Sequence, residues 1–286
     1  SNYIHDRQGI SVDDYVSGAA IYITNSSDIT IENNIFDNNA RGVSVEGKGI
    51  SAPSTDVVIK NNVLSRTKWD SGLKVRAVDN AEFTNNQVID NGLVADFKNH
   101  RITGLLAWES NNVLFSNNYS TGSSSDGLGA ATSLEIGDVS PTWRAISTNF
   151  RGNVSIANGE QGLWLDYLDK GEVSNNYVAL NNNDDPALGS SGIRLEDAVD
   201  DFSIFDNLII KNEQPGINLG SSSKNEVFNN YIDAGGNEGV HVSDEFYRVT
   251  IKKPNSSSNY IHNNFIQNAQ FSIYLRSGFA NRVVMN

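Results

Sequence analysis

NNYIDAGGNEGVHV, residues 229–242, contains the pattern on which the chain is built: an Asn pair, a few mostly polar residues, then Gly and an apolar–x–apolar strand. The pair, or one Asn of it, recurs every 23 to 35 residues along the chain. The recurring positions are Asn33-Asn34, Asn61-Asn62, Asn85-Asn86, Asn117-Asn118, Asn153, Asn175-Asn176, Asn207, Asn229-Asn230 and Asn263-Asn264. A period of this length, with strands of period two, predicts a solenoid whose coils stack around one long core.

We therefore expect an all-β fold, a single-stranded right-handed parallel β-helix of about ten coils, with residues 1–286 as one domain. At roughly 4.8 Å per coil, the stack would be about 45–50 Å long. The Asn pairs are expected at tight turns, where Asn tolerates left-handed backbone and its amide forms ladders.

The start of the chain resembles the middle of a coil. Residues 1–6, SNYIHD, nearly repeat residues 258–263, SNYIHN. Solenoid ends need capping, and no amphipathic capping helix is visible at residue 1. We expect the natural chain to extend upstream of an N-terminally truncated β-helix, where a signal peptide would also lie.

Composition excludes several functional classes. The net charge is −13 and the pI about 4.6, which disfavours nucleic acid because binding it requires a basic surface. The absence of Cys excludes disulfides and thiolate chemistry, and no apolar run is long enough to span a membrane. The acidic balance also weighs against a polyanionic glycan unless a cation bridges the two.

The strand after each Gly contributes two outward-facing residues, because alternate residues of a strand point to opposite faces. Stacking the coils aligns these residues into two columns along one sheet. The first column is expected to contain Tyr22, Ser44, Lys74, Leu106, Ser133, Trp164, Arg194, Asn218, His241 and Tyr274. The second is expected to contain Thr24, Glu46, Arg76, Trp108, Glu135, Asp166, Glu196, Gly220, Ser243 and Arg276.

The middle of this face combines outward Trp108 and Trp164 with the carboxylates of Glu135, Asp166 and Glu196. Like charges on neighbouring strands destabilise a sheet, so carboxylates crowded in a groove suggest acid–base chemistry. The alternative is a solvated acidic face on an acidic protein.

The sharpest motif is residues 162–167, GLWLDY, followed one coil later by residues 192–197, GIRLED. It resembles right-handed parallel β-helix glycosidases of the β-xylosidase type, in which a strand reading roughly Gly-Ile-Trp-Leu-Asp-Trp precedes a coil that supplies a Glu. The resemblance implies Asp166 as nucleophile, Glu196 as acid/base and Trp164 as a sugar platform. Tyr167 in place of the second Trp, and Arg194 beside the Glu, depart from that pattern.

Strand spacing supports the pair independently. Equivalent positions on adjacent coils are about 4.8 Å apart, close to the roughly 5–5.5 Å between the carboxyl groups of retaining glycosidases. If Glu135 and Glu196 acted together from two coils apart, inversion would follow instead.

Two other functions remain open. A polysaccharide lyase acting on a uronate-containing glycan would use Lys74, Arg76 or Arg194, although Lys74 and Arg76 also read as surface partners of Glu46 and Glu109. A non-catalytic glycan-binding or surface β-helix needs no chemistry at all, since one fold hosts many functions.

We expect a secreted or cell-surface glycoside hydrolase whose partner is a polysaccharide or oligosaccharide; it needs no cofactor, with Ca²⁺ as the alternative left open. Asp184, Asp185, Asp197, Asp200 and Asp201 supply the oxygen ligands that Ca²⁺ prefers, but they lack a binding-loop spacing, so we expect no metal site there. The expected catalytic residues are Asp166, Glu196 and Glu135. The expected substrate contacts are Trp164, Trp108, Tyr167, Arg194, Lys74, Arg76 and His241.

Overall fold

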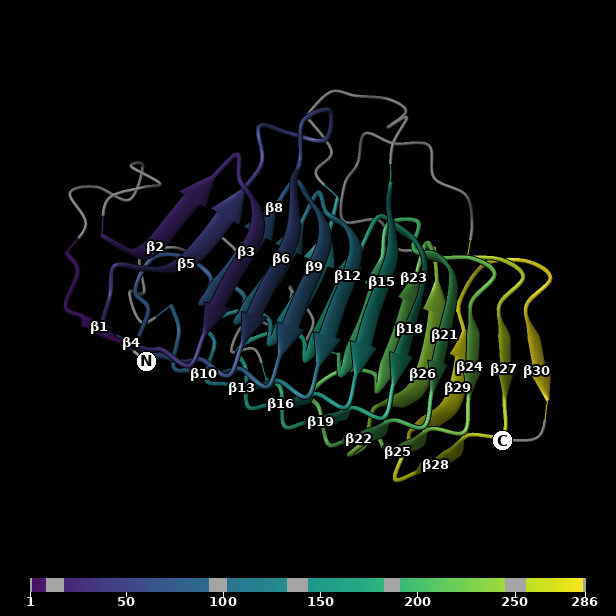
Figure 1. Ribbon diagram of the computed structural model, residues 1–286. Helices are drawn as coiled ribbons and strands as arrows, with labels where there is room; N and C mark the ends of the chain where they lie inside the picture. Colours follow the sequence, from purple (N-terminus) through teal and green to yellow (C-terminus); the bar gives the residue numbers. More distant parts are fainter. Residues whose placement is uncertain are drawn as a thin grey trace.

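The computed structural model describes residues 2–8, 18–92, 102–132, 144–182, 191–244 and 256–284. Over these residues the chain is a right-handed parallel β-helix, as the repeat predicts. Thirty strands form three ten-stranded sheets, and each coil adds one strand to each sheet. The coils stack in chain order from β1–β3 at one end to β28–β30 at the other (Figure 1). No helix in the described ranges is long and apolar enough to cross a lipid bilayer.

Sheet A contains only three-residue strands. They are β1 (Tyr3–His5), β4 (Ile35–Asp37), β7 (Val63–Ser65), β10 (Gln87–Ile89), β13 (Tyr119–Thr121), β16 (Val154–Ile156), β19 (Tyr177–Ala179), β22 (Leu208–Ile210), β25 (Tyr231–Asp233) and β28 (Phe265–Gln267).

Sheet B contains the strands that follow the repeated Gly. They are β2 (Ala19–Thr24), β5 (Arg41–Glu46), β8 (Leu73–Arg76), β11 (Leu105–Trp108), β14 (Leu128–Ala131), β17 (Leu163–Asp166), β20 (Ile193–Glu196), β23 (Ile217–Gly220), β26 (Glu238–Ser243) and β29 (Phe271–Leu275).

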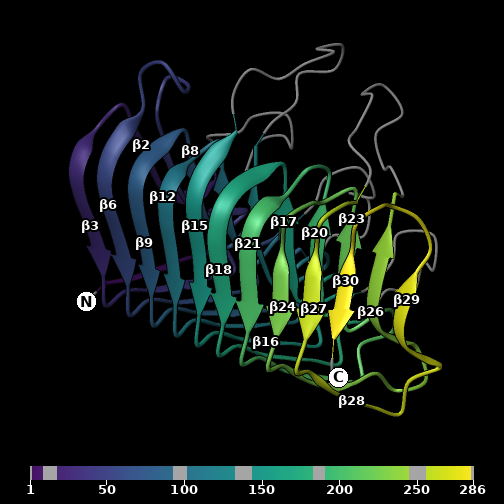
Figure 2. The ribbon, with the colours of Figure 1, turned by 90° about the vertical axis from the view of Figure 1, so that its right-hand side faces the viewer.

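Sheet C completes each coil, and its strands lie in a row in Figure 2. They are β3 (Ser27–Glu32), β6 (Ser54–Lys60), β9 (Val78–Thr84), β12 (Asn111–Ser116), β15 (Ala145–Arg151), β18 (Leu168–Ser174), β21 (Asp200–Phe205), β24 (Glu226–Phe228), β27 (Tyr260–His262) and β30 (Arg282–Val284).

The Asn pairs form the turn from sheet C to sheet A. The first residue of each pair is left-handed, with φ between 53° and 63°, and Gly152 and Asp206 take this position in the two coils with a single Asn. The second residue is buried, and its side-chain amide donates to the side-chain oxygen of the next coil's Asn at 2.9–3.2 Å. The predicted turn and ladder are both confirmed.

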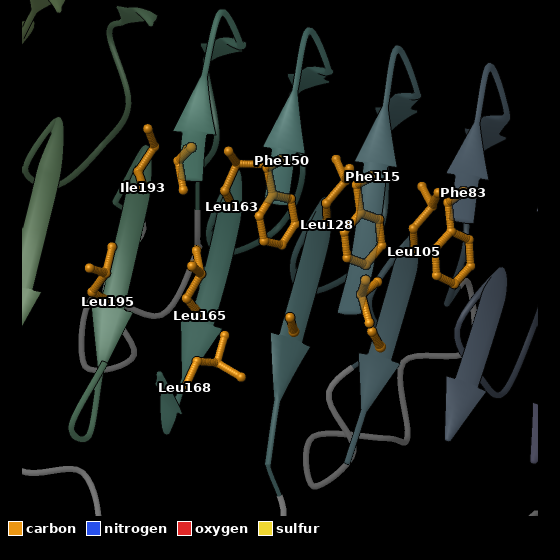
Figure 3. Packing of buried hydrophobic residues seen from close by; sticks show 14 of the residues in the cluster. Phe83, Leu105, Phe115, Leu128, Phe150, Leu163, Leu165, Leu168, Ile193 and Leu195 are labelled. Atoms are coloured by element: carbon orange, nitrogen blue, oxygen red, sulfur yellow. The ribbon is translucent and has the colours of Figure 1, made fainter. Parts of the chain in front are cut away.

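The core is one continuous apolar column between the three sheets. The inward residues predicted from the repeat, Leu163, Leu165, Ile193, Leu195, Ile217 and Leu219, are all fully buried. On the sheet C side of the core, Phe83, Phe115 and Phe150 of successive strands stack with ring centroids 4.8 and 4.6 Å apart (Figure 3).

The repeated Gly at the start of the sheet B strands is explained by close backbone packing between coils. A Cβ at Gly192 would lie 2.7 Å from the carbonyl oxygen of Gly216 on the next coil. Because the backbones approach so closely where the chain enters sheet B, a side chain does not fit at this position. The Gly therefore fixes where each sheet B strand begins and, with it, the register of the outer face.

Candidate functional site

The outer face of sheet B carries the candidate site. β17 and β20 pair in parallel, with Trp164 opposite Arg194 and Asp166 opposite Glu196. The flanking coils continue both columns, because Arg194 is paired with Asn218, and Glu196 with Gly220. The structure thus places Asp166 and Glu196 on neighbouring strands and on the same face, as the repeat predicts.

The prediction for the fifth coil is wrong. Its sheet B strand is β14, in which Gly129 pairs with Leu106 and Trp164, and Ala131 pairs with Trp108 and Asp166. Gly127 is the repeated Gly of this coil, so Leu128 and Ala130 point inward and the column positions fall earlier than Ser133 and Glu135. Ser133 and Glu135 lie outside the described residues.

Trp164 packs as part of the protein, which corrects its predicted role as an open sugar platform. It is only 1% exposed and forms an apolar cluster with Leu106 and Ala131 on the outside of the sheet. A Cβ at Gly129 would lie 3.0 Å from Cε3 of Trp164. The indole therefore lies over a strand without a bulky side chain, while Trp108 packs on the cluster and is half-buried.

The two carboxyl groups of the site are buried. Asp166 is 1% exposed and Glu196 is 4% exposed, so their interpretation as part of a solvated acidic face is wrong. The indole N–H of Trp164 donates to Oε2 of Glu196 at 3.0 Å. Nη2 of Arg194 donates to Oε1 at 3.4 Å. An indole donor and a guanidinium together favour the ionised form of Glu196.

Tyr167 does not belong to the columns. It occupies the turn after β17 with φ of 56° and packs against Ala198. The guanidinium of Arg144 lies 5.1 Å from the centre of its ring and donates to Asp200 at 2.8 Å. These contacts make Tyr167 part of a structural cluster beside the site.

Lys74 and Arg76 occupy their predicted column positions but are bound to acids. Nζ of Lys74 lies 3.4 Å from Glu46 and 3.7 Å from Asp70. Nε of Arg76 lies 3.0 Å from Glu109. Both cations therefore match their interpretation as partners of neighbouring carboxylates.

Nothing in the described ranges indicates a metal centre. Among these residues, no group of three or more His, Asp or Glu side chains is arranged to hold a metal ion. Asp200 is paired with Arg144, and Asp201 lies 3.9 Å from Lys224. Asp184 and Asp185 lie outside the described residues.

Beyond Arg194, the same face carries the predicted contact His241 together with Asn218 and Ser243, which the site prediction passed over. His241 lies two coils from Arg194, with Asn218 between them and Ser243 beside it on β26. Asn218 and Ser243 both stand in the predicted columns, and the signal that would have selected them is their position next to Arg194 and His241.

Several solved structures share this fold. The mannuronan C-5 epimerase AlgE4 A-module of Azotobacter vinelandii is 17% identical, with a TM-score of 0.65 over 90% of this chain and 64% of its own. The DFA-IIIase of Arthrobacter chlorophenolicus A6, solved with GF2, is 10% identical, with a TM-score of 0.56 over 96% and 68%. The surface protein and adhesin PfbA of Streptococcus pneumoniae is 11% identical, with a TM-score of 0.51 over 91% and 75%.

At these identities the likeness concerns the fold, and the chain spans less than two thirds of the epimerase module's length. No curated protein matches the sequence at a significant level. The model of the right handed beta helix region matches residues 1–120 and 103–286, which together cover the whole chain. With its Asn ladder, three parallel sheets and this match, the chain belongs to the right-handed β-helix family.

Proposed function

We propose that the protein is a glycoside hydrolase that cleaves a polysaccharide or oligosaccharide with Asp166 and Glu196. The observation that carries this proposal is their pairing on adjacent strands, since a strand spacing of about 4.8 Å suits the roughly 5–5.5 Å carboxyl separation of retaining glycosidases. The local resemblance to β-helix glycosidases over the same two coils supports it.

The hydrogen bonds of Glu196 favour the reverse of the roles that this resemblance implies. Trp164 and Arg194 stabilise a negative charge on Glu196. A second charge next to it in a buried place is unfavourable, so the proton of the pair belongs on Asp166. We assign Glu196 as the nucleophile and Asp166 as the acid/base.

The reaction then has two balanced steps. Glu196 forms a bond to the anomeric carbon while Asp166 gives its proton to the departing glycosidic oxygen. Asp166, now ionised, takes a proton from water as that water attacks the anomeric carbon and releases Glu196. Both carboxyl groups return to their starting protonation states, and the sugar keeps its anomeric configuration.

A carbohydrate ligand and a secreted or surface location belong to the same proposal. Among proteins of this fold, one is named a mannuronan epimerase, one a DFA-IIIase and one a surface adhesin. Half-buried Trp108, next to the Trp164 cluster, is the aromatic residue best suited to contact a sugar's C–H face.

Elimination from a uronate is a weaker candidate. Lys74 and Arg76 are paired with carboxylates, and the net charge of −13 disfavours an unbridged polyanion. Incubation with alginate and pectate should give no rise in ultraviolet absorbance from an unsaturated product. A rise in absorbance that is lost in the Lys74→Ala variant would reject hydrolysis and favour elimination as the function.

The test is a screen of wild-type protein against neutral and acidic oligosaccharides, followed by azide rescue on whatever is cleaved. Glu196→Ala should be inactive. Added azide should restore cleavage and yield a glycosyl azide of inverted configuration, because azide then takes the nucleophile's place. Asp166→Ala with an activated leaving group should give a glycosyl azide of retained configuration. The opposite pattern would restore the roles implied by the resemblance.

Asn182→Ala serves as the matched control, because Asn182 is exposed and should leave turnover unchanged. Full activity of Glu196→Gln and Asp166→Asn would refute the carboxylate pair. An inactive wild-type protein that still binds glycans would favour the non-catalytic binding function instead.

A further inference from the structure

The outer face of sheet B continues past the carboxylate pair into two coils that are rich in polar side chains. Asn218 of β23 pairs with Arg194 on one side and with His241 of β26 on the other. Ser243 follows His241 by two residues and therefore points to the same face. Asn218 and His241 thus lie one strand spacing apart, about 4.8 Å, and Ser243 is two residues further along β26, diagonal to Asn218 at roughly 7–8 Å.

Each of these residues has a buried polar atom that lacks a hydrogen-bond partner within the described part of the chain. The atoms are Oδ1 of Asn218, Nε2 of His241 and Oγ of Ser243. His241 is 9% exposed, and Ser243 is fully buried. Buried polar atoms are nearly always paired, and an unpaired one costs about 1–3 kcal/mol. Three on one face, beside a candidate catalytic pair, indicate a place prepared for polar groups of a ligand.

The atoms also indicate what kind of ligand fits. Asn218 Oδ1 accepts hydrogen bonds, a neutral imidazole nitrogen donates or accepts, and the Ser243 hydroxyl does both. Burial is the main cause that lowers the pKa of His241, with a smaller contribution from Arg276, against the opposing charge of Glu238. A neutral imidazole among acceptors, on the same face as acidic Asp166 and Glu196, suits sugar hydroxyls better than a carboxylate.

The residues around the three atoms combine a position without a side chain and an aromatic boundary. Gly220 stands between Glu196 and Ser243 in the second column and contributes no side chain there. Beyond His241, the ring of Tyr274 packs at 5.1 Å, tilted by 54°, and itself stacks on Phe271 at 5.3 Å. An aromatic boundary next to polar atoms is the combination that a sugar, with its C–H faces and hydroxyl edges, requires.

We propose that Asn218, His241 and Ser243 form a subsite for a neutral sugar ring, one to two coils from the carboxylate pair. The proposal rests on the proposed function only in treating this ring as part of the glycan whose linkage reaches Asp166 and Glu196. Sugar hydroxyls donate to Asn218 Oδ1 and exchange hydrogen bonds with the imidazole and the Ser243 hydroxyl.

The experiment measures binding separately from cleavage. Asp166→Asn, which prevents turnover, is titrated calorimetrically with neutral xylo-, cello- and manno-hexaoses and with an oligogalacturonate. At least one neutral hexaose should bind, and adding Asn218→Ala and Ser243→Ala should weaken its binding at least tenfold. Adding Asn182→Ala instead should leave binding unchanged.

A stability measurement separates a ligand-binding role from a structural one. Asn218→Ala and Ser243→Ala each remove a buried atom that has no hydrogen-bond partner among the described residues, so both variants should be as stable as the parent or more stable. A residue that only supports the fold would lose stability on truncation. Ser243→Ala, the smaller change, is informative even where Asn218→Ala folds poorly.

The subsite is overturned if no neutral hexaose binds, if the double variant binds as well as the parent, or if the oligogalacturonate binds as tightly as the neutral sugar. Binding that depends on Asn218 and Ser243 without any cleavage by the wild-type protein would retain the subsite and reject the hydrolase. Cleavage with an unchanged KM in the double variant would retain the hydrolase and reject the subsite.

Discussion

At the scale of single residues, the site depends on small side chains as much as on charged ones. Gly129 and Ala131 leave room on the outer face for the indole of Trp164, which then reaches Glu196. Glu196 is thus held by a tryptophan whose position is decided by the neighbouring coil.

Gly129→Ala should therefore destabilise the protein. Its methyl group would lie 3.0 Å from Cε3 of Trp164 and 3.3 Å from Cγ2 of Thr103, so the indole has to move. We expect a loss of about 1–3 kcal/mol, typical of an overpacked site, measured by urea denaturation. In a Trp164→Leu background the same substitution should cost less, and an equal loss in both backgrounds would contradict the packing argument.

His241 should make stability depend on pH. Its pKa in the folded protein is lowered from the ordinary 6.5, mainly by burial, so the unfolded chain binds more protons between the two pKa values. Stability should be complete above pH 6.5 and fall as the pH drops toward the folded pKa. His241→Gln should lose this part of the pH dependence in urea titrations between pH 5 and 8, and an unchanged slope would be evidence against it.

At the scale of elements, the Asn ladder joins the coils at the turn from sheet C to sheet A. Asn153 shows its full geometry. The residue accepts from the backbone and side chain of Asn118 at 3.0 Å and donates to Phe115 at 3.0 Å and to Asn176 at 2.9 Å. Every rung is both a donor and an acceptor, so removing one affects two neighbouring coils.

Asn153→Ala should cost about 3 kcal/mol or more, because each buried group left unpaired costs about 1–3 kcal/mol. Denaturant unfolding followed by circular dichroism measures this loss. The matched control is Asn182→Ala, since Asn182 is exposed and makes no side-chain hydrogen bond within the described part of the chain. If both variants lost the same small amount, the ladder would contribute little.

At the scale of the whole molecule, the solenoid has one continuous core, and each strand pairs with strands of the adjacent coils. Stability in such proteins is close to a sum over repeats and their interfaces. A central defect therefore weakens two interfaces, whereas a change on the outer surface weakens none.

Leu165→Ala should cost about 2–5 kcal/mol, because Leu165 is fully buried in the middle of the core. Leu208→Ala is the matched control, since Leu208 points outward from sheet A and is exposed; its substitution should change stability by less than about 0.5 kcal/mol. Urea midpoints of the two variants measure the difference. Similar losses at both positions would reject the single-core description.

The sequence by itself determined the β-helix, its ten coils, the Asn turns, the inward leucines and the pairing of Asp166 with Glu196. These features depend on the local period, which decides the face to which a side chain points and repeats in every coil. The same pattern failed at the fifth coil, where Gly127 was passed over, and it did not reveal the separate strands of sheet C.

Only the tertiary structure decided what surrounds the outward side chains. The hydrogen bond from Trp164 to Glu196, the pairing of Lys74 with Glu46 and of Arg76 with Glu109, and the position of Asn218 beside His241 all join residues 20 or more positions apart. Strand alternation fixes the direction of each side chain. Whether an outward side chain is exposed or buried depends on the side chains that the neighbouring coils place beside it. Those side chains are distant in the sequence, so the local pattern does not reveal them.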